Sequence, residues 1–179
     1  MSDLRLKADM VLQDCKHSLR AYNLQLQSEE LRIKWLCVIT LLRAVGHVLR
    51  NVDAKRGDVK LTKIIGDKFR EMINHQKYYP IFYEFILKER NRFLKQYEHG
   101  ITRILRPKPG TNLKGWSLTS DVSISMGTVI VPNERDEMVS YLSSGPYKGR
   151  YEKDVAQEAY DWWVKIIAEI KSDYGNSDK

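Results

Sequence analysis

A histidine and an arginine near the middle of the chain have the types and the spacing that acid–base chemistry on a phosphodiester needs. His99 follows Arg92 by seven residues, and seven helical steps bring two side chains to within about 20° of one another. A ribonuclease that uses no metal needs a group that titrates near neutral pH and a cation that stabilises the phosphorane. The pair fits that requirement, although a solvated face of an amphipathic helix can carry the same residues.

Two polar stripes extend the positive charge around this pair. Glu89 and Lys95 fall on the same predicted helix face, and Glu89 precedes Arg92 at ion-pair spacing. A second stripe lies on an otherwise apolar helix at steps of three, four and three residues: Thr40, Arg43, His47 and Arg50. It predicts either a phosphate-binding surface or a narrow solvent strip with ion pairs to Glu84 and Glu89.

Aromatic residues crowd the start of the helix that carries Arg92: Tyr78, Tyr79, Phe82, Tyr83 and Phe85. Rings at a surface can stack on unpaired bases, whereas rings inside a bundle pack its core. Trp162 and Trp163 are neighbours on another helix, where adjacent side chains diverge by about 100°, so we expect only one of them to face the core squarely. The pattern leaves both roles open for the first group.

Five helices are predicted from apolar residues that recur every three or four positions. Their ranges are 3–27, 28–51, 61–74, 80–106 and 152–174. The second is apolar almost all round and is expected to form the centre of a bundle. The fourth is the longest, and it ends before Pro107 because proline cannot continue a helix.

A short β segment is predicted between the fourth and the fifth helix. Polar and apolar residues alternate after Gly115, and this period of two predicts one or two strands within 115–132. The predicted fold is mainly α: a four- to five-helix bundle with a small β-hairpin insertion before the C-terminal helix. We expect one domain over 1–179, with a basic helical bundle at 1–106 and a C-terminal helix at 151–174 that packs on it.

Charge is divided unevenly along the chain. The 179 residues carry a formal net charge of +7. Residues 1–110 hold 22 Lys and Arg against 12 Asp and Glu, whereas residues 111–179 hold 8 against 11. The basic first part points to a polyanion partner, nucleic acid before membrane. Hydrophobic residues make up 42%, with 5 Pro and 10 Gly, which excludes a disordered or collagen-like chain.

The sequence holds no motif for a metal, a nucleotide cofactor or a membrane span. It has no P-loop, dinucleotide fingerprint or H-E-x-x-H, and Cys15 and Cys37 cannot form a four-ligand zinc site alone. Charged residues interrupt the longest apolar stretch, 33–49, so we expect no membrane span. Asp3 and Asp9 interrupt the first residues, so we expect no secretory signal and a reduced, cytoplasmic protein.

The predicted bundle and the segment 89–99 together resemble the HEPN superfamily of helical domains that bind nucleotides and RNA. The resemblance covers the first four predicted helices and the last one. The family carries an Arg-x(4-6)-His motif, often with Asn after the arginine. Arg92 and His99 fit its longer spacer, while the Arg-Asn pair in this chain is Arg90-Asn91. The resemblance implies a metal-independent endoribonuclease, commonly at a homodimer interface, in a toxin or defence setting.

These observations lead to one hypothesis and two alternatives. In the hypothesis, His99 acts as general base or acid, Arg92 stabilises the phosphorane, and Asn91 orients the phosphate or the histidine. The RNA backbone binds to five further residues: Arg90, Lys95, Arg43, His47 and Arg103. No cofactor is expected. The first alternative is a noncatalytic helical module that binds protein, nucleic acid or a nucleotide. The second is a nucleotide-binding helper of a nucleotidyltransferase.

Overall fold

The computed structural model describes residues 4–23, 28–98, 100–107 and 136–176, and within these ranges the protein is mainly helical. Its elements in chain order are α1 (Lys7–Ala21), α2 (Ser28–Asn51), α3 (Val59–Asn74), a π-helical segment (Ile81–Ile86), α4 (Leu87–Gln96), β1 (Ile101–Pro107), β2 (Asp136–Leu142) and α5 (Glu152–Asn176). The prediction of a mainly α bundle with a small hairpin before the C-terminal helix is confirmed.

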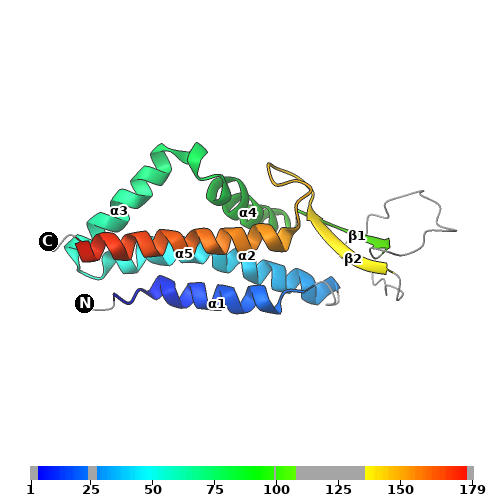
Figure 1. The fold of residues 1–179 in the computed structure, drawn as a ribbon, viewed down its shortest axis with the longest axis horizontal. Coiled ribbons are helices and arrows are strands. Elements are labelled where there is room, and N and C mark those ends of the chain that lie inside the picture. Colours follow the sequence, from blue (N-terminus) through cyan, green and yellow to red (C-terminus); the bar gives the residue numbers. More distant parts are fainter. Residues whose placement is uncertain (1–3, 24–27, 99, 108–135, 177–179) are drawn as a thin grey trace.

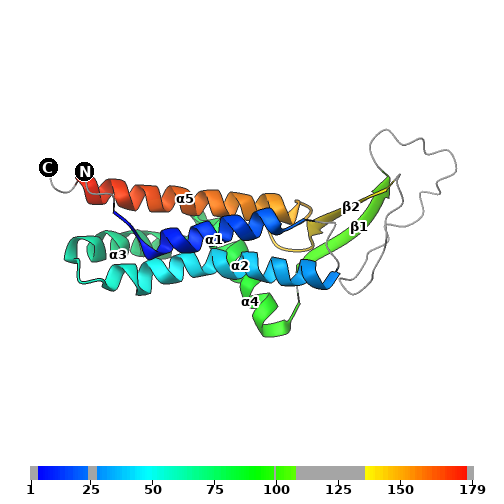
Figure 2. The same cartoon turned by 90° about the horizontal axis from the view of Figure 1, so that it is seen from below.

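The helices form an elongated bundle with the hairpin at one end. α2 and α5 run side by side along the long axis, and α1 packs against both (Figures 1 and 2). On the other side, α3 leads away from α2 and α5 and α4 returns toward them, so that the two form a V in Figure 1. The β1–β2 hairpin projects from the end of the bundle opposite to the two termini.

Large aromatic side chains fill the centre of the bundle. Trp35 on α2 and Trp163 on α5 are fully buried, and the Trp163 indole donates a 2.8 Å hydrogen bond to the Leu42 carbonyl. α5 approaches α2 this closely because position 46 is glycine: a Cβ on Gly46 would lie 2.6 Å from the Trp163 ring. Trp162 is half-buried, as expected for a neighbour that cannot face the core squarely.

Aspartate side chains set where two of the helices begin. The buried Asp53 side chain accepts the N–H groups of Lys7 and Ala8 at 2.8 and 2.9 Å, so α1 begins at Lys7 instead of near residue 3. Asp58 caps α3 by accepting the Leu61 N–H at 2.9 Å. The cap at Asp53 comes from a residue 46 positions away in the chain, which periodicity alone does not reveal.

The prediction of one long helix over 80–106 is wrong. α4 ends at Gln96, where Tyr97 takes a left-handed conformation with φ 54° and ψ 28°, and Ile101 begins strand β1. The isoleucines at 101 and 104 fit a helical repeat as well as a strand, because a short apolar run carries both periods. Pairing with β2 decides the conformation here.

The two strands pair in antiparallel register from Ile101 opposite Leu142 to Pro107 opposite Asp136. Residues 108–135 connect them and lie outside the described ranges, so the strands predicted within 115–132 cannot be compared. The C-terminal helix predicted at 151–174 is confirmed as α5, Glu152–Asn176.

One helical stretch of the described chain is long and apolar enough to cross a membrane by length and composition. It is Glu29–Lys55, with a mean hydropathy of 1.3 and 39% of the window buried inside the protein. The core helix of a bundle passes the same test, so this is weak evidence for a membrane span. In this fold Leu31, Trp35 and Leu42 on α2 are fully buried against neighbouring elements.

Candidate nucleic-acid interface

Three arginines lie along one line of α2. Arg43 follows Arg32 by eleven residues and precedes Arg50 by seven, and each of these steps rotates the side chain by only about 20° around a helix. Each guanidinium lies over an aromatic ring of a neighbouring segment, at 5.5 to 5.7 Å from the ring centre. The pairs are Arg32 with Tyr97, Arg43 with Phe82 and Arg50 with Phe69. We call Arg32, Arg43 and Arg50 the arginine track.

No carboxylate neutralises the track in the described part of the chain. The two glutamates predicted as its ion-pair partners are engaged elsewhere on their own helix: Glu84 binds Lys88, and Glu89 binds Arg92. None of the three guanidiniums forms a salt bridge within the ranges that the structure covers. The track is therefore a row of positive charges whose guanidinium groups lie over aromatic rings and have no anionic partner among the described residues.

A fourth cation, Arg90 on α4, joins the track at its middle. Burial lowers the pKa of Arg43, and the charges of Arg90 and Arg50 lower it further. Like charges held close together in a partly dry site favour the binding of an anion between them. Arg90 is in turn oriented by its neighbour, because its Nη1 donates a 3.0 Å hydrogen bond to the Asn91 side-chain oxygen.

Two polar side chains stand beside the track. His47 is exposed, and its Nδ1 lies 3.3 Å from the Asn51 amide nitrogen, which also donates to the His47 carbonyl at 3.0 Å. If the amide donates to Nδ1, the ring carries its proton on Nε2, where it can donate to an anion. Burial raises the pKa of Tyr83, while the charge of nearby Arg50 lowers it, so this half-buried phenol remains a neutral donor.

A second polar cluster, the Glu89 cluster, joins α4 to the hairpin. Its members are Glu89, Arg92, Gly100, Ser144 and Trp35. Glu89 is 5% exposed and accepts the Gly100 N–H at 2.8 Å and the Trp35 indole N–H at 3.4 Å. Arg92 lies 3.3 Å from the other Glu89 oxygen and donates to the Ser144 hydroxyl at 2.7 Å. The predicted Glu89–Arg92 ion pair is confirmed.

Gly100 has no room for a side chain in this cluster. A Cβ there would lie 2.0 Å from Arg92 Nη1 and 2.7 Å from Glu89 Oε2. The close approach lets one carboxylate hold both the Arg92 guanidinium and the backbone of the residue that follows His99. The chain thus returns to Arg92 after α4 has ended.

The helix that carries Arg92 ends before the chain reaches His99. His99 lies outside the described residues, and α4 ends three residues before it, so the helical spacing that linked it to Arg92 does not apply. Asn91 contacts Arg90. Lys95 is exposed in the last turn of α4. The left-handed residue Tyr97 ends the helix along which the Arg92–His99 spacing was counted.

Arg103 has a different place from the predicted one. It was expected on a long helix as a contact to the RNA backbone, but it lies on β1 and is 5% exposed. Burial and the Glu152 charge raise the pKa of Tyr22, and the charge of nearby Arg103 opposes that rise, in the interior where α1, β1 and α5 meet. Arg103 thus belongs to a buried network and not to the surface that holds the track.

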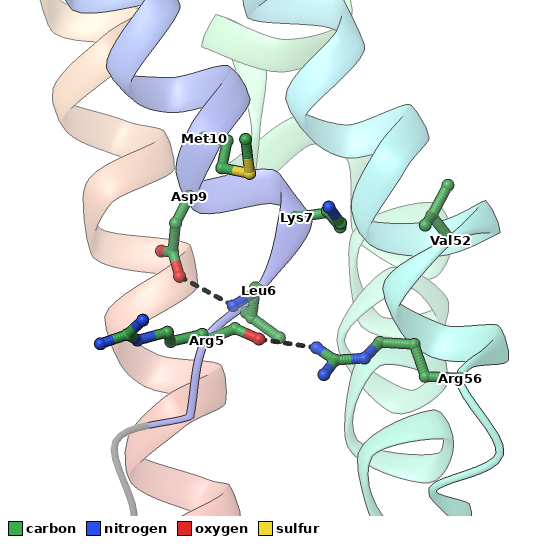
Figure 3. A pocket seen from close by; sticks show the side chains of 7 residues that line it. All are labelled: Arg5, Leu6, Lys7, Asp9, Met10, Val52 and Arg56. Carbon is green, nitrogen blue, oxygen red and sulfur yellow. Dashed lines mark hydrogen bonds between the residues drawn. The ribbon is translucent and has the colours of Figure 1, made fainter.

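A pocket of about 520 Å³ lies near the N-terminus of α1, at the end of the bundle away from the hairpin. Figure 3 shows the residues that line it: Arg5, Leu6, Lys7, Asp9, Met10, Val52 and Arg56. One of the cations at its rim has an internal partner, because Arg56 donates to the Arg5 carbonyl at 2.6 Å. None of the residues predicted to act on RNA lines it.

Sequence reasoning missed two members of this surface, Arg32 and Tyr97. The eleven-residue step from Arg32 to Arg43 was a usable signal, because it equals three helical turns. Nothing in the local sequence marked Tyr97, which was expected inside a helix. The described residues contain no group of three or more His, Cys, Asp or Glu side chains that could hold a metal ion.

Comparisons with protein-family models, with curated proteins and with solved structures returned no significant match. The resemblance to HEPN domains therefore rests on the residues quoted above and stays a prediction.

Proposed function

We propose that this protein binds RNA along the arginine track, with Arg90 as a fourth cation. The observation that carries the proposal is a row of guanidiniums without carboxylate partners among the described residues. The planar guanidinium donates two parallel hydrogen bonds to a phosphate, and phosphate contacts release the counterions of a polyanion. The net charge of +7 also favours binding of a polyanion.

The length of the track favours an extended polyanion over a small anion. Arg32 and Arg50 are separated by 18 residues of one helix, which corresponds to roughly 27 Å along its axis. A single phosphate can meet the guanidiniums at the middle of the track, but only a chain of phosphates can contact both of its ends. RNA supplies such a chain, and the aromatic rings beneath the guanidiniums keep these side chains ordered before it binds.

The salt dependence of RNA binding tests the proposal. For single strands, the logarithm of the association constant falls with the logarithm of salt concentration by about 0.7 for each phosphate contacted. We expect Arg43→Gln and Arg90→Gln each to weaken binding and to reduce this slope, measured by fluorescence anisotropy with a labelled oligoribonucleotide. Arg20→Gln is the matched control, because Arg20 is exposed on α1. A slope that is flat in the wild type would contradict the proposal.

Metal-independent cleavage of the bound RNA is a second candidate function. It is favoured by the Glu89 cluster, in which Arg92 and the chain neighbour of His99 bind one carboxylate. A guanidinium that is already held by Glu89 and Ser144 needs little reorganisation when charge develops on phosphorus. In this candidate Arg92 stabilises the phosphorane and His99 transfers the proton.

Cleavage in the presence of EDTA separates the enzyme from a noncatalytic module. We expect His99→Ala to reduce the cleavage rate by a factor of about 10² to 10⁴ while RNA binding is retained. Equal rates in the two proteins would remove the role of His99. RNA binding by a wild type that does not cleave would favour the noncatalytic helical module.

The candidate enzyme also implies a homodimer, because HEPN-like sites commonly combine two copies of the motif. Sedimentation velocity of the intact protein measures this directly. A monomer at the concentrations at which RNA is cleaved would show that one copy of Arg92 and His99 is sufficient.

A further inference from the structure

Tyr97 holds a backbone conformation that side chains other than glycine avoid. Its φ is 54° and its ψ is 28°, and no other non-glycine residue in the described ranges has a positive φ. The three other positive-φ positions there are Gly57, Gly145 and Gly149. A left-handed residue at the end of a helix is usually glycine, because a Cβ crowds the following carbonyl. The tyrosine at this position therefore calls for a reason other than the turn.

Packing does not supply that reason. Tyr97 is 67% exposed, and its one aromatic contact among the described residues is an edge-on approach to Phe93 with ring centres 5.4 Å apart. A large ring that is mostly in solvent buries too little apolar surface to compensate for an unfavourable backbone. Non-glycine residues in this conformation are enriched at binding sites, where the surrounding structure holds them in place.

The ring is ordered by a cation of the arginine track. The Arg32 guanidinium lies 5.5 Å from the centre of the Tyr97 ring. Arg32 Nε is buried and has no hydrogen-bond partner in the described part of the chain, so nothing there competes with the ring for this side chain. At this end of the track, an exposed aromatic ring and a guanidinium thus lie within contact distance.

We propose that Tyr97 stacks on an unpaired base of the RNA whose phosphates lie on the arginine track, and that it makes the protein selective for single strands. This inference rests on the proposed RNA binding. Every base presents a flat face to an aromatic ring when the strand is unpaired, whereas the bases of an A-form duplex are stacked on one another and its grooves offer no free base face. Arg32 would hold the phosphate next to that base.

Two substitutions separate stacking from a structural role. Tyr97→Gly removes the ring and places the preferred residue in the left-handed conformation. Tyr97→Phe keeps the ring and loses only the hydroxyl. The probe is a short A-rich single strand of about 12 nucleotides, with a duplex of the same length for comparison, both measured by fluorescence anisotropy.

We expect Tyr97→Gly to bind the single strand roughly tenfold more weakly than the wild type does and to bind the duplex equally well. Tyr97→Phe should bind both as the wild type does. The Tm of Tyr97→Gly should equal or exceed that of the wild type, since its backbone is relieved. A fall in Tm would indicate a structural role, and Tyr97→Asn, which also tolerates this conformation, then provides the ring-free comparison.

Failure of the inference and failure of the proposed function give different results. If Tyr97→Gly binds the single strand as tightly as the wild type does, or loses affinity equally for the duplex, base stacking by Tyr97 is wrong while the track remains. If the wild type binds neither RNA, or if Arg43→Gln binds RNA as tightly as the wild type does, RNA binding along the track is wrong. The proposed stacking by Tyr97 is then wrong as well.

Discussion

At the scale of single residues, Glu89 has the largest set of polar contacts in the candidate site. Its buried carboxylate accepts from the Gly100 backbone and from Trp35 and pairs with Arg92. A buried carboxylate is stable only while its partners remain, because an uncompensated buried charge is costly. The position of Arg92 therefore depends on the empty space at Gly100.

We predict that Gly100→Ala breaks this arrangement. The new Cβ would lie 2.0 Å from Arg92 Nη1 and 2.7 Å from Glu89 Oε2, so one or both of these side chains must shift, and we expect their contact to be lost. Loss of hydrogen bonds to a buried charge is expected to lower the free energy of unfolding by about 1 to 3 kcal/mol, measured by urea denaturation. If the protein cleaves RNA, the cleavage rate of Gly100→Ala should be lower than that of the wild type, because Arg92 is no longer held in place.

The matched control is Gly66→Ala on α3. A Cβ on Gly66 meets no atom within 4 Å, and its φ is not positive. Alanine in a helix interior is expected to stabilise by about 0.5 to 1 kcal/mol relative to glycine. Two glycine-to-alanine changes should thus shift stability in opposite directions. A small or positive effect at Gly100 would mean that Arg92 does not need this geometry.

The sequence predicts those contacts of the site that are local in the chain and misses those between distant residues. The Glu89–Arg92 pair is one helical turn apart, so spacing alone identified it. Ser144 lies 52 residues from Arg92, and no local pattern connects them. Asn91 was expected to act on the phosphate or the histidine. Its side-chain oxygen accepts a hydrogen bond from the adjacent Arg90, a contact that sequence spacing alone does not indicate.

At the scale of elements, helix bodies were easier to predict than helix ends. The apolar repeat of α2 and α5 locates both helices because their buried faces are long. Ends depend on caps, and the caps come from other segments or from a single unusual residue. Asp53 fixes the start of α1 from a distance, and Tyr97 stops α4 where the apolar repeat continues.

Asp58 gives a prediction about pH at the start of α3. The Leu61 N–H and then the Tyr174 hydroxyl hold the pKa of Asp58 below its ordinary value of 3.8. A carboxyl whose pKa is lower in the folded state stabilises that state fully above the unfolded pKa. This stabilisation is lost as the pH falls below about 4 and through the folded pKa.

We therefore expect Asp58→Asn to lower the Tm at pH 7 and to show a smaller difference from the wild type in the acid range below the ordinary pKa. Thermal unfolding followed by circular dichroism at a series of pH values measures this. Asp67→Asn is the control, because Asp67 is exposed on α3 and, within the ranges that the structure covers, pairs only with exposed Arg70. A constant difference at all pH values would show that the charge of Asp58 is not involved.

At the scale of the whole molecule, a buried polar network attaches the hairpin to the bundle. Glu152, the first residue of α5, is 1% exposed and accepts the Tyr22 hydroxyl at 2.7 Å. The Ser140 hydroxyl on β2 donates to the same oxygen. Burial and the Glu152 charge raise the pKa of Tyr22 well above 10.0, so the phenol remains a donor at neutral pH. One carboxylate thus connects the end of α1, the hairpin and α5.

This network predicts that substitutions at Tyr22 and at Ser140 have non-additive effects on the free energy of unfolding. Tyr22→Phe leaves the buried Glu152 with one hydroxyl donor fewer, so we expect the free energy of unfolding, measured by urea denaturation, to fall by about 1.5 to 3 kcal/mol. The control is Tyr151→Phe, because Tyr151 is exposed and its change should alter this free energy by less than about 0.5 kcal/mol. Ser140→Ala removes the other hydroxyl from the same oxygen. Because both donors compensate one charge, the double variant should differ from the sum of the single effects by about 0.5 kcal/mol or more. Additive losses would mean that α1 and the hairpin are attached to α5 separately, and the shared carboxylate would then not be what couples the projecting hairpin to the helices.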